Sequence, residues 1–210
     1  MIRELVLVSG DLSISPWFAS RSPPIPTLPE GLTIGHARTK ADAELFVTGP
    51  ISREVAAGRF ADGDTCSVVI KPDRGVIGQM WCTEKTRYIE WIGCDVKPPE
   101  GHVHLYNAWV EPEFRGLGLQ WILAAVSCSD VVDRGLHHIC AGVERKEYPP
   151  FARKYAAMTL GVISAYGSIW ALRMFGMTAK ISAGPPRSLD KASEAARKIF
   201  ARRAGRLPCA

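Results

Sequence analysis

The segment from Val110 to Gln120 reads V-E-P-E-F-R-G-L-G-L-Q and lies between a run typical of a strand and one typical of a helix. Glycines at 116 and 118 directly follow Arg115, so the backbone N–H groups are exposed where the helix begins. Those N–H groups lack partners within the helix and carry the positive end of the helix dipole, so such a site attracts anions. Two glycines also occur in ordinary turns, and the flanking sequence decides between a turn and a phosphate-binding loop.

The flanks alternate short β-rich runs with runs of helical periodicity. Turn residues separate them, as in Pro72-Asp73-Arg74-Gly75, which joins two arms of a hairpin. Residues 88–96 either extend the sheet or cover it. The pattern predicts strands over 32–37, 65–71, 76–83, 102–110 and 138–143, helices over 40–47, 51–60, 119–132 and 149–160, and two closing strands within 162–181.

The chain of 210 residues suits one domain with extensions at both ends. Residues 1–31 form an extended lead-in, because 9–31 are rich in serine and proline and predict no regular structure. Residues 32–181 form the folded domain. Residues 182–210 comprise a proline-containing linker and a basic helix over 189–204.

The formal net charge of +5 comes from the tail. Residues 1–181 hold 19 Lys or Arg and 19 Asp or Glu, whereas residues 182–210 hold 7 and 2. The main domain is therefore balanced, and no nucleic-acid partner is expected for it. The basic helix has two interpretations. It docks on its own domain or on a partner subunit in a homodimer, or it contacts nucleic acid or an anionic membrane.

The six cysteines include no C-x-x-C pair and no regular spacing, which indicates reduced and mostly buried thiols. Residues 1–8 are too short and too acidic for a signal peptide. The uncharged run 156–172 is interrupted by glycine and serine and predicts no transmembrane segment. These observations lead us to expect a cytoplasmic protein.

Strands, a phosphate-type loop and helices in this order predict an α+β domain with a mostly antiparallel sheet. Here the sequence resembles the GNAT acyltransferase superfamily, over about residues 32–181. The superfamily pattern V-x-P-x-x-R-G-x-G is matched by Val110, Pro112, Arg115, Gly116 and Gly118. Leu160-Gly161-Val162 resembles the Leu-Gly-Phe that closes its last helix. The resemblance implies the GNAT fold, a twisted sheet flanked by helices.

The resemblance also implies a donor, acetyl-CoA or another acyl-CoA, and no metal. The loop amides would bind the pyrophosphate, and the pantetheine arm would lie where the strand before the loop splays from strand 138–144. An amine would attack directly, with the backbone N–H of Val110 holding the oxyanion. The implied cofactor-binding positions are Ala108, Trp109, Val110, Arg115, Gly116, Leu117, Gly118, Leu119 and Gln120.

Three positions depart from the superfamily pattern. Gln120 replaces a glycine or alanine, which crowds the loop but keeps the backbone N–H. The tyrosine that protonates the leaving thiolate would fall at Ala157, and the nearest candidate, Tyr155, is about 200° away around a helix. Pro150 replaces an asparagine at the start of that helix.

Candidate general bases lie on the strand before the loop. His102, His104 and Tyr106 alternate, so a regular strand places them on one face with Ala108 and Val110. A neutral histidine would deprotonate an ammonium nucleophile directly or through water. Exposed or structurally satisfied histidines are the alternative. The candidate catalytic residues are His104, Tyr106 and Tyr155, with Glu144 a weaker alternative base.

A metal site built from His102, His104, His137 and His138 would lack a carboxylate or cysteine at ligand spacing. The sequence therefore predicts an acyltransferase, most simply an N-acetyltransferase, acting on a small-molecule or peptide amine. One alternative is a long-chain N-acyltransferase that takes its donor from acyl-carrier protein, with segments around Trp81, Trp91 and Trp170 lining a tunnel. Another is a GNAT-like binding module without catalysis.

Overall fold

The computed structural model describes residues 2–13, 27–89, 94–98, 100–144, 157–166, 169–174 and 177–182. The chain divides into two compact units. We name the first the loop unit, because it contains the segment Val110–Gln120; it comprises Leu12–Thr83 and Leu105–His137. We name the second the β1 unit, after its first strand; it comprises Met1–Asp11, Glu84–His104 and His138–Ala210.

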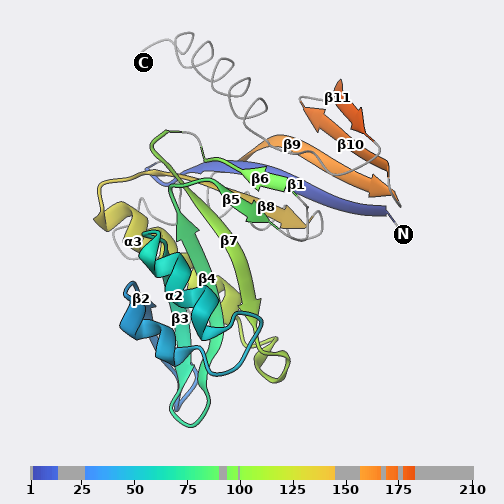
Figure 1. The fold of residues 1–210 in the computed structure, drawn as a ribbon. Helices are drawn as coiled ribbons and strands as arrows, with labels where there is room; N and C mark the ends of the chain where they lie inside the picture. The colour runs from blue at the N-terminus through green and yellow to red at the C-terminus, as the bar shows by residue number, and fades with distance from the viewer. Residues whose placement is uncertain are drawn as a thin grey trace. The chain divides into compact units, whose positions relative to one another are not determined.

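The loop unit is built on strands in the order β7-β4-β3-β2 (Figure 1). β2 pairs antiparallel with β3, and β3 pairs antiparallel with β4. The sequence of β3 is rich in β-branched residues, which favour strands, and its Cys66 and Val68 are buried. The bounds are β2 (Thr33–Ala37), β3 (Thr65–Lys71), β4 (Gly75–Thr83) and β7 (His102–Val110), the last contributing Leu105–Val110 to this unit.

Helices cover both faces of this sheet. The 3₁₀ helix η1 (Lys40–Leu45) and α2 (Arg53–Ala61) lie on one face, and α3 (Leu119–Asp133) lies on the other. On β4, Trp81 contacts Phe60 of α2, whereas Gly78, three residues earlier, lies against Leu123 of α3. An odd separation along a strand places two residues on opposite faces, so the two helical layers sandwich the sheet.

Polar contacts attach α3 to the sheet. Ser127 donates a hydrogen bond to Ser67 of β3 at 2.8 Å, and both hydroxyls are buried. The buried carboxylate of Asp130 forms ion pairs with Arg38 and with Arg134. A buried charge needs such partners, because isolation in an apolar interior is costly.

The β1 unit contains strands in the order β11-β10-β9-β1-β8. β1 (Ile2–Asp11) pairs antiparallel with β8 on one side and with β9 on the other. β5 and β6 form a separate antiparallel pair, so the segment 88–96 does not extend the larger sheet. The remaining bounds are β5 (Arg87–Ile89), β6 (Cys94–Val96), β8 (His138–Glu144), β9 (Ala157–Tyr166), β10 (Ile169–Met174) and β11 (Met177–Ser182).

Three expectations from the sequence are wrong in this unit. The lead-in begins as a strand, because Ile2–Asp11 pairs along both of its edges. The helix expected to run to residue 160 does not do so, since Ala157–Tyr166 is β9 and Leu160-Gly161-Val162 lies within that strand. The closing segment contains β9, β10 and β11 rather than two strands. Residues 149–156 of that helix lie outside the described residues.

Two other sequence expectations concern burial and membrane crossing. The thiols of Cys66, Cys82, Cys128 and Cys140 are free and buried, and burial raises the pKa of Cys82 and Cys140 to about 12. They are therefore neutral and poorly nucleophilic at pH 7. Among the described helices, none has the length and apolarity needed to cross a membrane. The basic helix expected over 189–204 lies outside the described part of the chain.

Candidate functional site

The loop between β7 and α3 has a defined backbone conformation. After β7 ends at Val110, the 3₁₀ turn η2 (Pro112–Phe114) redirects the chain. Arg115 then closes the turn, its Nε donating to the carbonyl oxygen of Val110 at 3.0 Å. Gly116 and Gly118 have φ values of +83° and +75°, in the left-handed region that glycine adopts without steric cost. The two glycines are therefore required by the backbone path.

The start of α3 presents unused N–H groups. Gly118 is the N-cap and provides no side-chain cap, and its carbonyl accepts from Trp121 and Ile122 at 3.0 and 3.2 Å. Among the described residues, no backbone acceptor pairs with the amides of residues 116–120. No acidic residue occupies the first turn. Nor does any described atom lie within 4 Å of where a Cβ would stand at Gly116 or Gly118. The residues present therefore fit a phosphate group.

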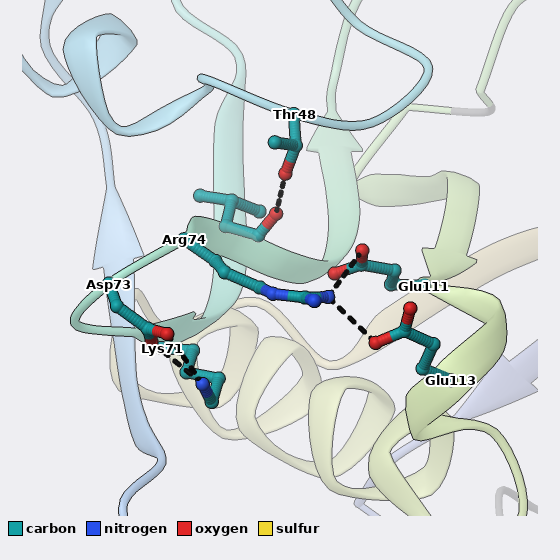
Figure 2. A network of polar contacts seen from close by, with 7 residues as sticks. Thr48, Lys71, Asp73, Arg74, Glu111 and Glu113 are labelled. Carbon is teal, nitrogen blue, oxygen red and sulfur yellow. Dashed lines mark hydrogen bonds and ion pairs between the residues drawn. The ribbon is translucent and has the colours of Figure 1, made fainter.

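An arginine from the neighbouring hairpin neutralises the acidic side of this loop. Arg74, in the β3–β4 turn, donates from Nη1 to Glu111 at 3.1 Å and to Glu113 at 2.8 Å (Figure 2). The same turn carries the ion pair of Lys71 with Asp73. Without Arg74, two carboxylates would lie beside the helix N-terminus, where they would compete with an incoming anion.

We expect R74Q to weaken binding of CoA by roughly two- to fivefold at low ionic strength. The cause is the uncompensated charge of Glu111 and Glu113, and the loss should shrink as salt screens them. Titration calorimetry with CoA at low and at high salt measures both effects.

K71Q is the matched control, because it removes one positive charge from the same turn without releasing either glutamate. The screening role of Arg74 would be contradicted if R74Q lost no more CoA affinity than K71Q does. It would also be contradicted if the loss of affinity in R74Q did not depend on salt.

An aromatic cluster occupies the face of the sheet under η1 and α2. The fully buried ring of Trp81 lies 5.5 Å from the ring of Phe46, 5.0 Å from Phe60 and 6.4 Å from Tyr106, measured between centroids. These tilted arrangements, at centroid distances of 5.0 to 6.4 Å, are favourable for aromatic pairs. Trp81 is therefore packed in the core of the loop unit and does not line a tunnel. The side chains of Trp91 and Trp170 lie outside the description.

Polar groups border this cluster. The hydroxyl of Tyr106 donates to Oδ2 of Asp64 at 2.5 Å, and both side chains are buried. The guanidinium of Arg59, on α2, lies 4.8 Å from the centroid of Trp81 and 5.1 Å from that of Tyr106. Cations stack favourably on aromatic faces in this range. The arrangement joins a phenol, a carboxylate and a guanidinium at one face of β7.

The structure changes which residues of β7 share a face. Tyr106 contacts Trp81 under α2, and the ring of Trp109 lies against Gly49, in the segment between η1 and α2. Both residues therefore point to the same helical layer although they are three positions apart. A regular strand would place them on opposite faces, so the expectation that Tyr106 shares a face with Ala108 and Val110 is wrong.

The other predicted site residues are dispersed. His104 is buried within β7, and Tyr155 lies outside the described residues. Ala108 is exposed, Trp109 half-buried and Val110 buried. In the loop, Arg115, Leu117 and Gln120 are exposed while the side chain of Leu119 is in the core, so Leu119 can offer only its amide.

The histidines predicted as an alternative metal site are not gathered into one. The rings of His102 and His138, both in the β1 unit, stack at 4.8 Å between centroids. Within the described residues, no group of three or more His, Cys, Asp or Glu side chains is placed to hold a metal ion. Glu144 ends β8, and its side chain is outside the description.

Sequence reasoning missed three residues that the structure brings to this site. Asp64 lies 42 positions before Tyr106, and Arg59 lies on a helix remote in sequence from β7. Asn107 is the third, with a φ of +46° inside a strand. The residue types gave a weak indication at best, because a single Asp before a strand and an Asn within one are common.

Comparisons with known proteins complete this description. No protein-family model matches the sequence, and no curated protein matches it. Among solved structures, a GCN5-related N-acetyltransferase-like protein from Streptococcus suis aligns with a TM-score of 0.53 at 15% identity, over 82% of this chain and 63% of that one. A tandem GNAT protein from the clavulanic acid biosynthesis pathway aligns with a TM-score of 0.50 at 11% identity, over 75% of this chain. The present chain covers half the length of the latter.

The chain is an α+β protein, as expected. Its fold is that of the GNAT N-acetyltransferases, which confirms at the level of fold the resemblance seen in the sequence.

Proposed function

We propose that this protein is an acyltransferase, most simply an N-acetyltransferase, that transfers an acyl group from a CoA thioester to an amine. The observation that carries the proposal is the loop at the start of α3. Its two left-handed glycines, its unused amides and the absence of acid in the first helical turn suit a pyrophosphate. The GNAT fold supports the same donor.

In this proposal the chain's own backbone holds the donor. Amides of residues 116–120 bind the pyrophosphate, and backbone groups of Ala108, Trp109 and Val110 bind the pantetheine arm. The thioester supplies the activated acyl group. The backbone N–H of Val110 stabilises the oxyanion that forms when the amine nitrogen attacks the carbonyl carbon. The carbon–sulfur bond then breaks, and the departing thiolate takes a proton from water, which balances the proton that the amine gives to the base.

Tyr106 is the candidate we favour for accepting the proton of the amine. Its hydroxyl donates to Asp64 at 2.5 Å, so when the phenol oxygen takes the proton of the amine, the phenol's own proton passes to the carboxylate. His104 and Tyr155 remain the other candidates. The acceptor is a small-molecule or peptide amine.

A two-part experiment tests the proposal. The purified protein is titrated with CoA, acetyl-CoA and an acylated carrier protein, and release of free thiol is then followed with a panel of amines. We expect CoA binding and amine-dependent thiol release. Binding of CoA without turnover on any amine would indicate a binding module. Stabilisation by acyl-carrier protein alone would favour a long-chain donor. No binding of any thioester would overturn the proposal.

A further inference from the structure

Asn107 is the only non-glycine residue with a positive φ in the part of the chain that the structure describes. Its φ of +46° lies in the left-handed region, which asparagine enters more readily than other side chains but still at a cost. It sits inside β7 and directly precedes Ala108, Trp109 and Val110. These three residues would hold the pantetheine arm.

The left-handed residue shifts the register of side chains along β7. Tyr106 before it lies under Arg59 of α2, and Trp109 after it lies against Gly49, in the segment that joins η1 to α2 on the same side of the sheet. In a regular strand, residues three positions apart point to opposite faces. Tyr106 and Trp109 can point to the same face only if the strand accommodates one additional residue between them, as a β-bulge does. Asn107 therefore determines which way the backbone amides of residues 108–110 point.

Arg59 reaches Asn107 from α2. With the amide of Asn107 oriented so that its oxygen faces the guanidinium, that oxygen accepts from Nη1 at 3.2 Å and from Nη2 at 2.8 Å. The guanidinium is itself held over the rings of Trp81 and Tyr106. A planar two-donor contact to one oxygen fixes the direction of the amide as well as its distance.

We propose that Arg59 is a positioning residue that holds Asn107 in the left-handed conformation and thereby sets the donor-binding backbone of residues 108–110. The inference rests on the proposed function for its catalytic consequence. Arg59 touches neither the donor nor the acceptor in this view and acts only through Asn107.

The test is a double-mutant cycle with R59M and N107G. Glycine adopts a positive φ without support from another side chain. In N107G, the residue at position 59 should therefore no longer affect the backbone conformation at position 107. We expect R59M to lower kcat/KM for acetyl-CoA by about tenfold in the natural background, which is the scale of a charge-assisted hydrogen bond, and by less than about twofold beside N107G. R53M, an exposed arginine on the same helix, is the matched control and should leave the rate unchanged.

An equal loss from R59M in both backgrounds would overturn the proposal, because Arg59 would then act independently of Asn107. The absence of any loss from R59M in the natural background would also overturn it. R59K guards against a folding defect, because it keeps the charge and most of the stem but not the two-donor contact. R59K should lose nearly as much of kcat/KM as R59M does, while its midpoint of urea unfolding stays close to that of the natural protein.

Amide hydrogen exchange of the free protein separates this inference from the proposed function. In R59M the amides of residues 108–110 should exchange about tenfold faster than in the natural protein. R59M/N107G should match N107G within about threefold. If the protein binds no CoA but the exchange rates of R59M and R59M/N107G change as expected, the proposed function fails and the positioning role of Arg59 is supported. If the protein binds CoA and acylates an amine but R59M leaves amide exchange at residues 108–110 unchanged, only the positioning role of Arg59 is contradicted.

Discussion

Replacing Gly116 and Gly118 together by alanine is expected to weaken CoA binding about 100-fold, since a left-handed residue other than glycine costs roughly 1–2 kcal/mol and 1.4 kcal/mol is tenfold in affinity. Both glycines have positive φ, and space for a methyl group is open at each. The loss would therefore come from the backbone: two alanines relieve their strain by leaving the conformation that presents the amides, and CoA binding must then restore that conformation. Titration calorimetry measures the affinity.

G135A provides the control for this prediction. Gly135 lies just beyond the C-terminal end of α3, has a φ of +77° and likewise has no described atom near its Cβ position. It carries the same conformational cost at a distance from the loop, so it should lower stability and leave CoA affinity unchanged. If G116A/G118A bound CoA as tightly as the natural protein does, the loop would not be part of the CoA-binding site.

Substituting Trp81 by alanine is expected to lower the free energy of unfolding by about 3–5 kcal/mol, the usual cost of deleting a fully buried large aromatic ring. The ring is enclosed by Phe46, Phe60 and Tyr106, and Arg59 stacks on it. Removal leaves a cavity between the sheet and α2 that these rigid rings cannot refill. Urea unfolding followed by circular dichroism measures the change.

V47A is the comparison for Trp81, because Val47 belongs to the same unit but is 59% exposed. V47A should lower the free energy of unfolding by no more than about 0.5 kcal/mol. A loss below about 1 kcal/mol in W81A would mean that the aromatic cluster is not the centre of this unit's core.

Much of the loop unit was predictable from local sequence. The strand over 65–71 matches β3, and the strand over 102–110 matches β7. The helix expected over 119–132 is one residue shorter than α3. Period-two and helical patterns bounded by glycine and proline are local properties, so they survive folding. The helix expected over 40–47 is a 3₁₀ turn over Lys40–Leu45.

The β1 unit was predicted less well, because its pairing is non-local. Residues 2–11 form a strand between β8 and β9, whose partners lie at least 127 positions away. Leu160-Gly161-Val162 matched a motif that ends a helix, yet it lies in β9 and pairs with β1. A short apolar run fits a helix or a strand, and the available edge of a neighbouring strand decides between them.

The conformation of the loop was predictable from its local residues. Arg115, Gly116 and Gly118 occur at a strand-to-helix junction, and the backbone there needs glycine, so residue type and spacing sufficed to predict the exposed amides. The conformation of the strand before the loop depends on tertiary contacts. Alternation predicted that Tyr106 shares a face with Ala108, but the left-handed Asn107 breaks the alternation. That conformation is stabilised by Arg59 from α2, a contact between residues 48 positions apart in the printed numbering, which no local pattern encodes.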